Sequence, residues 1–122
     1  MSLNLLPTTI SSAPINEVLN YDVLTQVIYY STADATGELH INFRGDSETT
    51  FASIVPVGQT LYTMLSVKVG TETLSLTKVT VDGIDVKIVP TMKQFPYTMS
   101  PNQTVSLIMN ITHAEPDVFW LY

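Results

Sequence analysis

The sequence contains no cysteine, and only 13% of its 122 residues are charged. The absence of cysteine excludes disulfides, thiolate metal ligands and cysteine nucleophiles. The charged share is about half of the quarter that is usual in soluble domains. Long surface helices carry Glu, Lys and Arg on their solvent side, so a chain this poor in charge is not expected to build them.

Basic residues are scarce as well, with five Lys and Arg against eleven Asp and Glu and a net charge of −6. An acidic surface without a basic cluster repels phosphate backbones and anionic headgroups, so neither a nucleic-acid partner nor membrane insertion is expected. The sequence also lacks the roughly 18 uninterrupted apolar residues of a membrane helix. Residues 1–11 carry no basic residue before their short apolar run, so no signal peptide is expected.

The clearest strand signal covers residues 104–112, after a turn at Pro101 and Asn102. Apolar side chains there alternate with hydroxyl and amide side chains, which is typical of a strand with one buried and one wet face. The apolar set is Val105, Leu107, Met109 and Ile111, and the polar set is Thr104, Ser106, Asn110 and Thr112. Ile108 is the exception, an apolar residue on the wet face that a neighbour could cover.

Further strands are predicted between turn signals, over residues 22–31, 38–43, 49–55, 60–69, 73–81, 84–88 and 118–122. The apolar parity shifts within 73–81, which indicates a β-bulge or a crossing between sheets. Asp82-Gly83 is a strong hairpin signal. Residues 15–20 match one helical turn after Pro14, and a single helix over 15–30 is the competing interpretation.

About eight short strands with regularly spaced turns predict an all-β fold, a single antiparallel β-sandwich of immunoglobulin-like or jelly-roll topology. We expect one sandwich domain over residues 15–122. Residues 1–14 are expected to form an extended N-terminal arm or an edge strand, which its leucines tie to a core or to a neighbouring subunit.

The turn and strand over residues 100–112 resemble the late strand pair of immunoglobulin-like domains of phage virions and bacterial surface proteins. In those domains a Pro-Asn/Gly-Gln turn leads into an alternating Val/Leu/Ile strand. The resemblance covers about a tenth of the chain. It implies an immunoglobulin-like sandwich with a structural or adhesive role, and it transfers no functional residue. The Cys…Trp…Cys pattern of antibody-type domains is absent.

Signals for catalysis are weak, so no enzyme activity and no cofactor are expected. His40 and His113 are the only histidines, they lack metal-ligand spacing, and no Gly-x-Ser-x-Gly elbow is present. The turn carboxylates follow no known calcium-loop spacing. Arg44-Gly45-Asp46 spells an integrin-type tripeptide on a predicted turn, and ordinary Gly-Asp turn chemistry explains the same residues.

Two sets of apolar and aromatic residues are candidate binding groups. The candidate protein-interface residues come from the two termini and the exceptional strand position: Leu3, Leu5, Leu6, Ile108, Phe119, Trp120 and Tyr122. The candidate groups for stacking on a ligand are Tyr30, Tyr62, Tyr97 and Trp120. Packing within the core or at sheet edges is the alternative for each.

These features favour a non-catalytic structural or decorating subunit of a larger assembly, a phage virion or a surface appendage. Its partners would be copies of itself or other virion or surface subunits, bound through its termini. The expected location is a virion or an extracellular surface. The alternative is a carbohydrate-binding module that stacks sugars on its surface aromatics, with a glycan as the partner.

Overall fold

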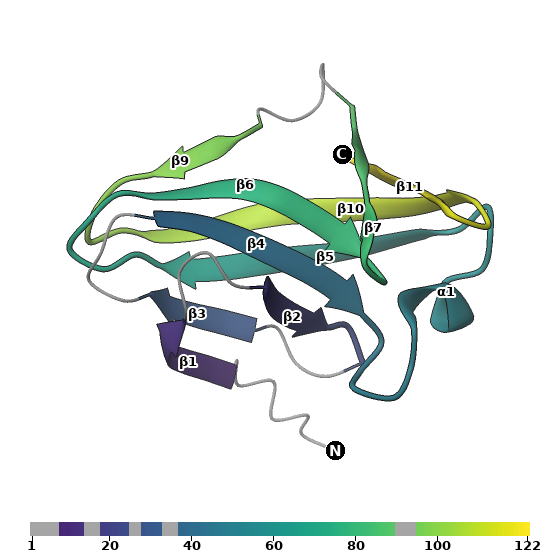
Figure 1. Ribbon diagram of the computed structural model, residues 1–122, viewed down its shortest axis with the longest axis horizontal. Coiled ribbons are helices and arrows are strands. Elements are labelled where there is room, and N and C mark those ends of the chain that lie inside the picture. The colour runs from purple at the N-terminus through teal and green to yellow at the C-terminus, as the bar shows by residue number, and fades with distance from the viewer. Residues whose placement is uncertain (1–7, 14–17, 25–27, 33–36, 90–94) are drawn as a thin grey trace.

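The computed structural model describes residues 8–13, 18–24, 28–32, 37–89 and 95–122, which form two packed β-sheets and one short helix (Figure 1). Sheet A has the order β1 (Thr8–Ala13), β3 (Ile28–Thr32), β5 (Thr60–Lys68), β10 (Thr104–Glu115), β11 (Val118–Leu121) and β8 (Lys87–Ile88). Sheet B has the order β2 (Val18–Asp22), β4 (Gly37–Arg44), β6 (Leu74–Val81) and β7 (Ile84–Asp85), and β9 (Tyr97–Met99) pairs with β6. The helix, α1, spans Phe51–Ile54. The prediction of an all-β fold is therefore confirmed at the level of class.

The first six strands alternate between the two sheets, and this determines their direction. A chain that reverses each time it crosses to the other sheet returns to the first sheet in its original direction. Accordingly β1–β3, β3–β5, β2–β4 and β4–β6 are all parallel pairs. Antiparallel pairs join β10 to β5 and β11, and β6 to β7 and β9. Both sheets are mixed, so a wholly antiparallel sandwich is not confirmed.

The pairing of β5 with β10 is the longest in the described residues and builds the middle of sheet A. Its register runs without a break from Thr60 opposite Thr112 to Lys68 opposite Thr104. The inward set Leu65, Val67, Met109 and Ile111 is fully buried. The turn before β10 has Asn102 at φ 61°, and its N–H donates to the Gly70 carbonyl at 2.8 Å. The predicted turn and both strands are confirmed.

The parity shift in β6 is a β-bulge. Leu39 lies opposite Leu76 and His40 lies opposite Lys78, so Thr77 is the extra residue. The bulge lets Leu74 and Leu76 before it, and Val79 and Val81 after it, all face the core. The hairpin that follows has positive φ at Asp82 (52°) and Gly83 (80°), as an Asp-Gly hairpin turn requires.

Residues 51–54 form a helix, so the strand predicted over 49–55 is wrong. The Thr50 side chain accepts the Ser53 N–H at 3.2 Å. The two carboxylate oxygens of Asp82 accept the N–H groups of Phe51 and Ala52 at 2.7 and 3.0 Å. The Asp82 carboxylate, some thirty residues away, thus accepts N–H groups that have no partner within α1. No pattern in residues 49–55 indicates this contact. Among the described residues, no helix has the length and hydrophobicity to cross a membrane.

Residues 18–22 form strand β2, so the predicted helical turn is wrong over the described residues 18–20. Leu19 and Tyr21 are buried while Val18 is half exposed, which is strand periodicity. The Tyr21 hydroxyl hydrogen-bonds Thr63 Oγ1 at 2.9 Å, and burial raises the pKa of this phenol. The strand predicted over 22–31 is confirmed only in part, because β2 ends at Asp22, residues 23–24 form a turn, and β3 covers 28–31. Residues 15–17 and 25–27 lie outside the described residues.

The C-terminal strand β11 packs against its own domain. Phe119 and Leu121 are buried, while Trp120 and Tyr122 are half-buried on the other face. The buried His113 stacks on Phe119 with ring centroids 4.6 Å apart. Its Nδ1 lies 2.6 Å from the Val55 carbonyl oxygen and its Nε2 3.2 Å from that of Pro116. His113 therefore ties the end of α1 to the β10–β11 turn.

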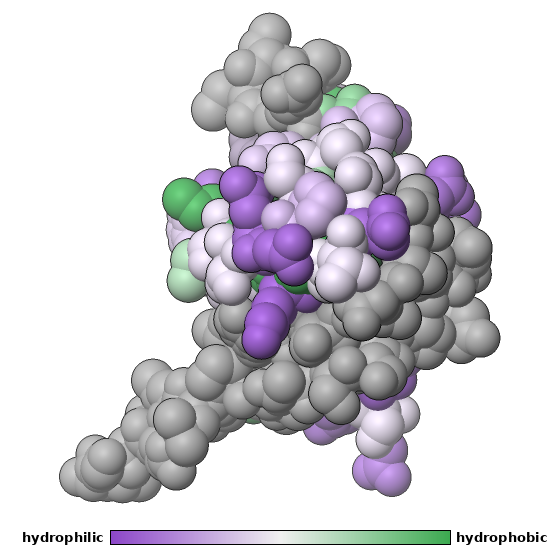
Figure 2. All heavy atoms as spheres, turned by 90° about the vertical axis from the view of Figure 1, so that its left-hand side faces the viewer, coloured by the Kyte–Doolittle hydropathy of each residue, from purple (hydrophilic) through white to green (hydrophobic). Residues whose placement is uncertain are grey.

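One end of the sandwich is polar. The turns after β5 and before β10 lie against each other there, and the Val69 N–H donates to the Gln103 carbonyl at 2.8 Å. Figure 2 views the molecule from the left-hand side of Figure 1, and the described side chains on this side are mostly hydrophilic. Among the described residues, hydrophobic side chains appear mainly at the margin of this view.

The capping of α1 by Asp82 predicts a specific loss on mutation. Asp82→Asn keeps a residue that tolerates positive φ, but it turns an NH2 group toward one backbone N–H. We expect the free energy of unfolding, measured by urea denaturation, to fall by about 1–2 kcal/mol. The control is Asp85→Asn on the same hairpin, whose carboxylate is exposed and 3.6 Å from Lys78. It should change stability by less than about 0.5 kcal/mol, and equal losses would contradict the cap.

Adjacent residues of β11 should differ sharply in their contribution to stability. Phe119 is 1% exposed and packs edge-on against Phe51 with centroids 5.7 Å apart. Phe119→Ala should lower the free energy of unfolding by about 3–5 kcal/mol. Trp120→Ala, on the outward face, should cost less than half as much. Thermal and urea unfolding of the two variants measure this, and a larger loss for Trp120→Ala would contradict the orientation of the strand.

Candidate binding surface

The outward face of β5, β10 and β11 carries a cluster of exposed apolar and aromatic side chains, here called the outer face of sheet A. Tyr62 is 76% exposed, Ile108 62% and Met64 41%. The register places Met64 opposite Ile108 and Tyr62 opposite Asn110, and Trp120 lies opposite Thr112. Half-buried Tyr122 follows, its N–H donating to the Asn110 carbonyl at 2.9 Å. Strand periodicity puts these side chains outside because their neighbours fill the core.

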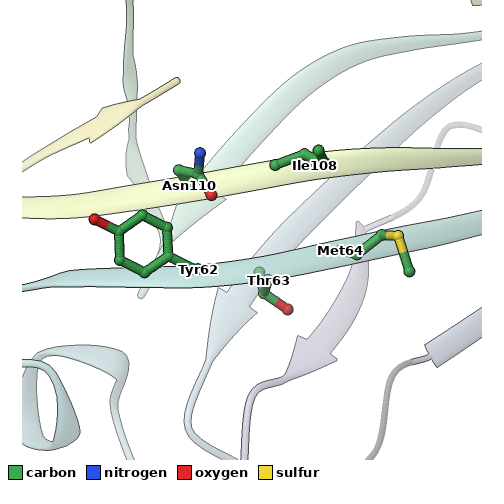
Figure 3. A pocket seen from close by; sticks show the side chains of 5 residues that line it. All are labelled: Tyr62, Thr63, Met64, Ile108 and Asn110. Atoms are coloured by element: carbon green, nitrogen blue, oxygen red, sulfur yellow. The ribbon is translucent and has the colours of Figure 1, made fainter.

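Two shallow hollows lie on this face. The first, shown in Figure 3, is lined by Tyr62, Thr63 and Met64 from β5 and by Ile108 and Asn110 from β10. The second is more polar and is lined by Thr60, Tyr62, Asn110, Thr112 and Tyr122. Tyr62 and Asn110 belong to both hollows. The face therefore changes along its length from aliphatic near Ile108 to aromatic and hydroxylated near Tyr122.

The outer face of sheet A has a distinctive charge pattern. The segments 60–68, 104–112 and 118–122 that build it contain no Asp or Glu, although the chain carries eleven. Lys68 lies at one end of β5, and Lys87 Nζ lies 5.7 Å from the centre of the Trp120 ring. Threonine and serine pairs hydrogen-bond across β5 and β10, Thr60 to Thr112 at 2.7 Å and Ser66 to Ser106 at 3.3 Å. A partner could cover this face without burying an Asp or Glu side chain.

Four residues singled out from the sequence meet on this face: Tyr62, Ile108, Trp120 and Tyr122. Phe119 does not join them, because its ring faces inward and fills the core. Tyr97 lies on β9 opposite Leu76 and packs against the core. Tyr30 belongs to β3, and its side chain lies outside the described residues, as do Leu3, Leu5 and Leu6.

Met64 and Asn110 are members of the site that the sequence did not single out. Each has the outward parity of its strand, so alternation alone places both on a wet face. The sequence alone does not show that β5 and β10 are neighbouring strands. That pairing brings Met64 to Ile108 and Asn110 to Tyr62.

The two histidines have structural partners. His113 contacts two carbonyl oxygens in the core. His40 Nε2 lies 3.2 Å from Thr80 Oγ1, and Thr80 donates its proton to Asn42 Oδ1 at 2.7 Å. Burial, with a smaller effect of Lys78, lowers the pKa of His40. Within the described ranges, no group of three or more His, Asp or Glu side chains is arranged to hold a metal ion.

The Arg44-Gly45-Asp46 tripeptide is used by its own turn. Arg44 Nε donates to Asp22 Oδ1 at 2.6 Å, which ties β4 to β2. Asp46 accepts the Glu48 N–H at 2.8 Å, and the N–H of Glu48 and the Thr49 side chain lower the pKa of this carboxyl. A Cβ on Gly45 would approach the Thr49 carbonyl oxygen to 2.8 Å. The ion pair between β4 and β2 explains Arg44, and local turn chemistry explains Gly45 and Asp46.

Comparisons with known proteins find no matching family model, no similar curated protein and no similar solved structure. The outer face of sheet A is thus characterised by its own geometry and chemistry alone.

Proposed function

We propose that this chain is a non-catalytic structural subunit of a larger protein assembly, a phage virion or a surface appendage. It binds neighbouring copies of itself through the outer face of sheet A. The observation that supports this most is the exposed cluster of Tyr62, Met64 and Ile108 on two paired strands. The C-terminal strand contributes Trp120 and Tyr122 to the same face, which links the proposal to the end of the chain.

Clustering is what distinguishes this face. The other exposed large hydrophobic side chains of the described residues are Val18, Leu24 and Val57. Val18 and Leu24 lie on β2 and in the turn after it, and Val57 lies in the turn before β5. Single exposed apolar residues are normal on soluble proteins, whereas a contiguous patch marks an interaction surface.

The size of the face favours a weak contact that is repeated in an assembly. Nine residues of β5 extend about 30 Å, and three strands span about 15 Å, for a footprint of about 450 Å². A stable two-protein interface covers about 800 Å² on each partner. One such contact therefore gives only weak pairwise association between two copies.

The charge pattern fits a second copy of this chain as the partner. Two acidic molecules repel each other in general, but this face brings no Asp or Glu side chain into the contact. Desolvating a carboxylate without a partner costs several kcal/mol, and this face avoids that cost.

The test is a sedimentation series on the wild-type chain and on Ile108→Asp. We expect the wild type to associate reversibly as its concentration rises into the hundreds of micromolar, as is typical of small interfaces. Ile108→Asp should remain monomeric, because it places a carboxylate in the middle of the contact. Leu24→Asp is the matched control, since Leu24 is 53% exposed but lies in the turn after β2 on the other sheet. A wild-type chain that stays monomeric, or equal effects of both substitutions, would contradict the proposal.

A further inference from the structure

The hollow between Tyr62 and Tyr122 combines aromatic rings with amide and hydroxyl groups. Three neighbouring strands supply one row, with Asn110 on β10 between Tyr62 on β5 and Tyr122 after β11. Thr60 and Thr112 form the next row, and together these five residues line the hollow. Two interstrand spacings separate the tyrosine backbones, about 10 Å. Two rings therefore flank an amide, with hydroxyl groups alongside.

The polar groups of this row have no other use within the described parts of the chain. There, neither the Asn110 amide nor the hydroxyls of Tyr62 and Tyr122 form a hydrogen bond. Asn42 offers the contrast on sheet B. Its amide donates to Asn20 at 3.0 Å and accepts from Thr80 and from the Gly83 N–H. Asn42 holds strands and a hairpin together, whereas Asn110 presents its amide to the solvent side.

We infer that this hollow binds a neutral sugar ring. A pyranose has an apolar C–H face, which packs on an aromatic ring, and hydroxyl groups at its rim, which need donors and acceptors. Tyr62 and Tyr122 supply the rings and Asn110 supplies both a donor and an acceptor. Thr60 and Thr112 share one hydrogen bond, and each oxygen keeps acceptor capacity for a sugar hydroxyl.

Other ligand classes fit less well. No charged side chain lines the hollow, so an anionic ligand finds no cation to pair with. A purely aliphatic ligand would leave the Asn110 amide without a hydrogen-bond partner. Trp120 does not line this hollow, and Lys87 Nζ lies 5.7 Å from the centre of its ring. The neutral sugar is the class that uses both the rings and the amide.

The experiment is a fluorescence titration of the intact chain with neutral oligosaccharides of glucose, xylose and N-acetylglucosamine. Sialylated and sulfated glycans are included as acidic controls. The best neutral ligand is then followed by two-dimensional amide NMR. We expect saturable binding with shifts centred on Tyr62, Asn110 and Tyr122. Tyr122→Ala should weaken binding about tenfold, the factor for one lost stacking contact, and Asn110→Ala should weaken it to a similar degree.

Leu24→Ala is the matched control and should leave sugar affinity unchanged, since exposed Leu24 lies in the turn after β2 on the other sheet and lines neither hollow. Circular dichroism confirms that each variant is folded. Three results would each overturn the inference: no fluorescence change with any neutral oligosaccharide, tighter binding of acidic glycans, or equal sugar affinity of Tyr122→Ala and the wild type. It does not rest on the proposed function. Tyr62, Asn110 and Tyr122 belong to both surfaces, so the titration is run at a dilution at which the chain is monomeric, and Ile108→Asp tests self-association separately because Ile108 does not line this hollow.

Discussion

The unbroken pairing of β5 with β10 is the constraint on which the rest of this structure depends. Side chains alternate along a strand, so a register that holds from Thr60 to Lys68 assigns every residue of both strands to one face. The inward set closes the core, and the outward set becomes the surface. A slip by one residue would bury Ile108 and Asn110 and expose Met109 and Ile111. The stability of the core therefore enforces the exposure of Tyr62 and Ile108.

The same logic explains how the C-terminal strand contributes to both core and surface. Phe119 and Leu121 are buried, and Phe119 packs between Phe51 and His113. That anchoring aligns β11 beside β10 and holds Trp120 and Tyr122 on the outer face. An aromatic end that looked wholly available to a partner is divided by strand periodicity. One half stabilises the fold, and the other half extends the proposed binding surface.

Local patterns in the sequence predicted most strands, the bulge in β6, the Asp82-Gly83 hairpin and the turn at Asn102. They failed where a distant group decides the local structure. Residues 51–54 are helical because Thr50 and the remote Asp82 cap them, although their β-branched and aromatic content is typical of a strand. Residues 18–20 are extended because Leu19 and Tyr21 fill the core. A strand shows the same alternation of apolar and polar residues whether its neighbours are parallel or antiparallel. The alternation therefore did not predict the order of the strands in each sheet.

The sequence predicted single outward-facing residues of the candidate site, but it did not predict that they cluster on one face. Parity alone placed Ile108 and Tyr62 on wet faces, and only the sheet order joined them to Tyr122. The most direct test of the central claim is a dilution series of amide NMR spectra of the unmodified chain. Self-association through the outer face of sheet A predicts that concentration-dependent shifts map to β5, β10 and β11 and that the turns at the polar end stay constant. Shifts confined to β2, or spectra that do not change with concentration, would contradict it.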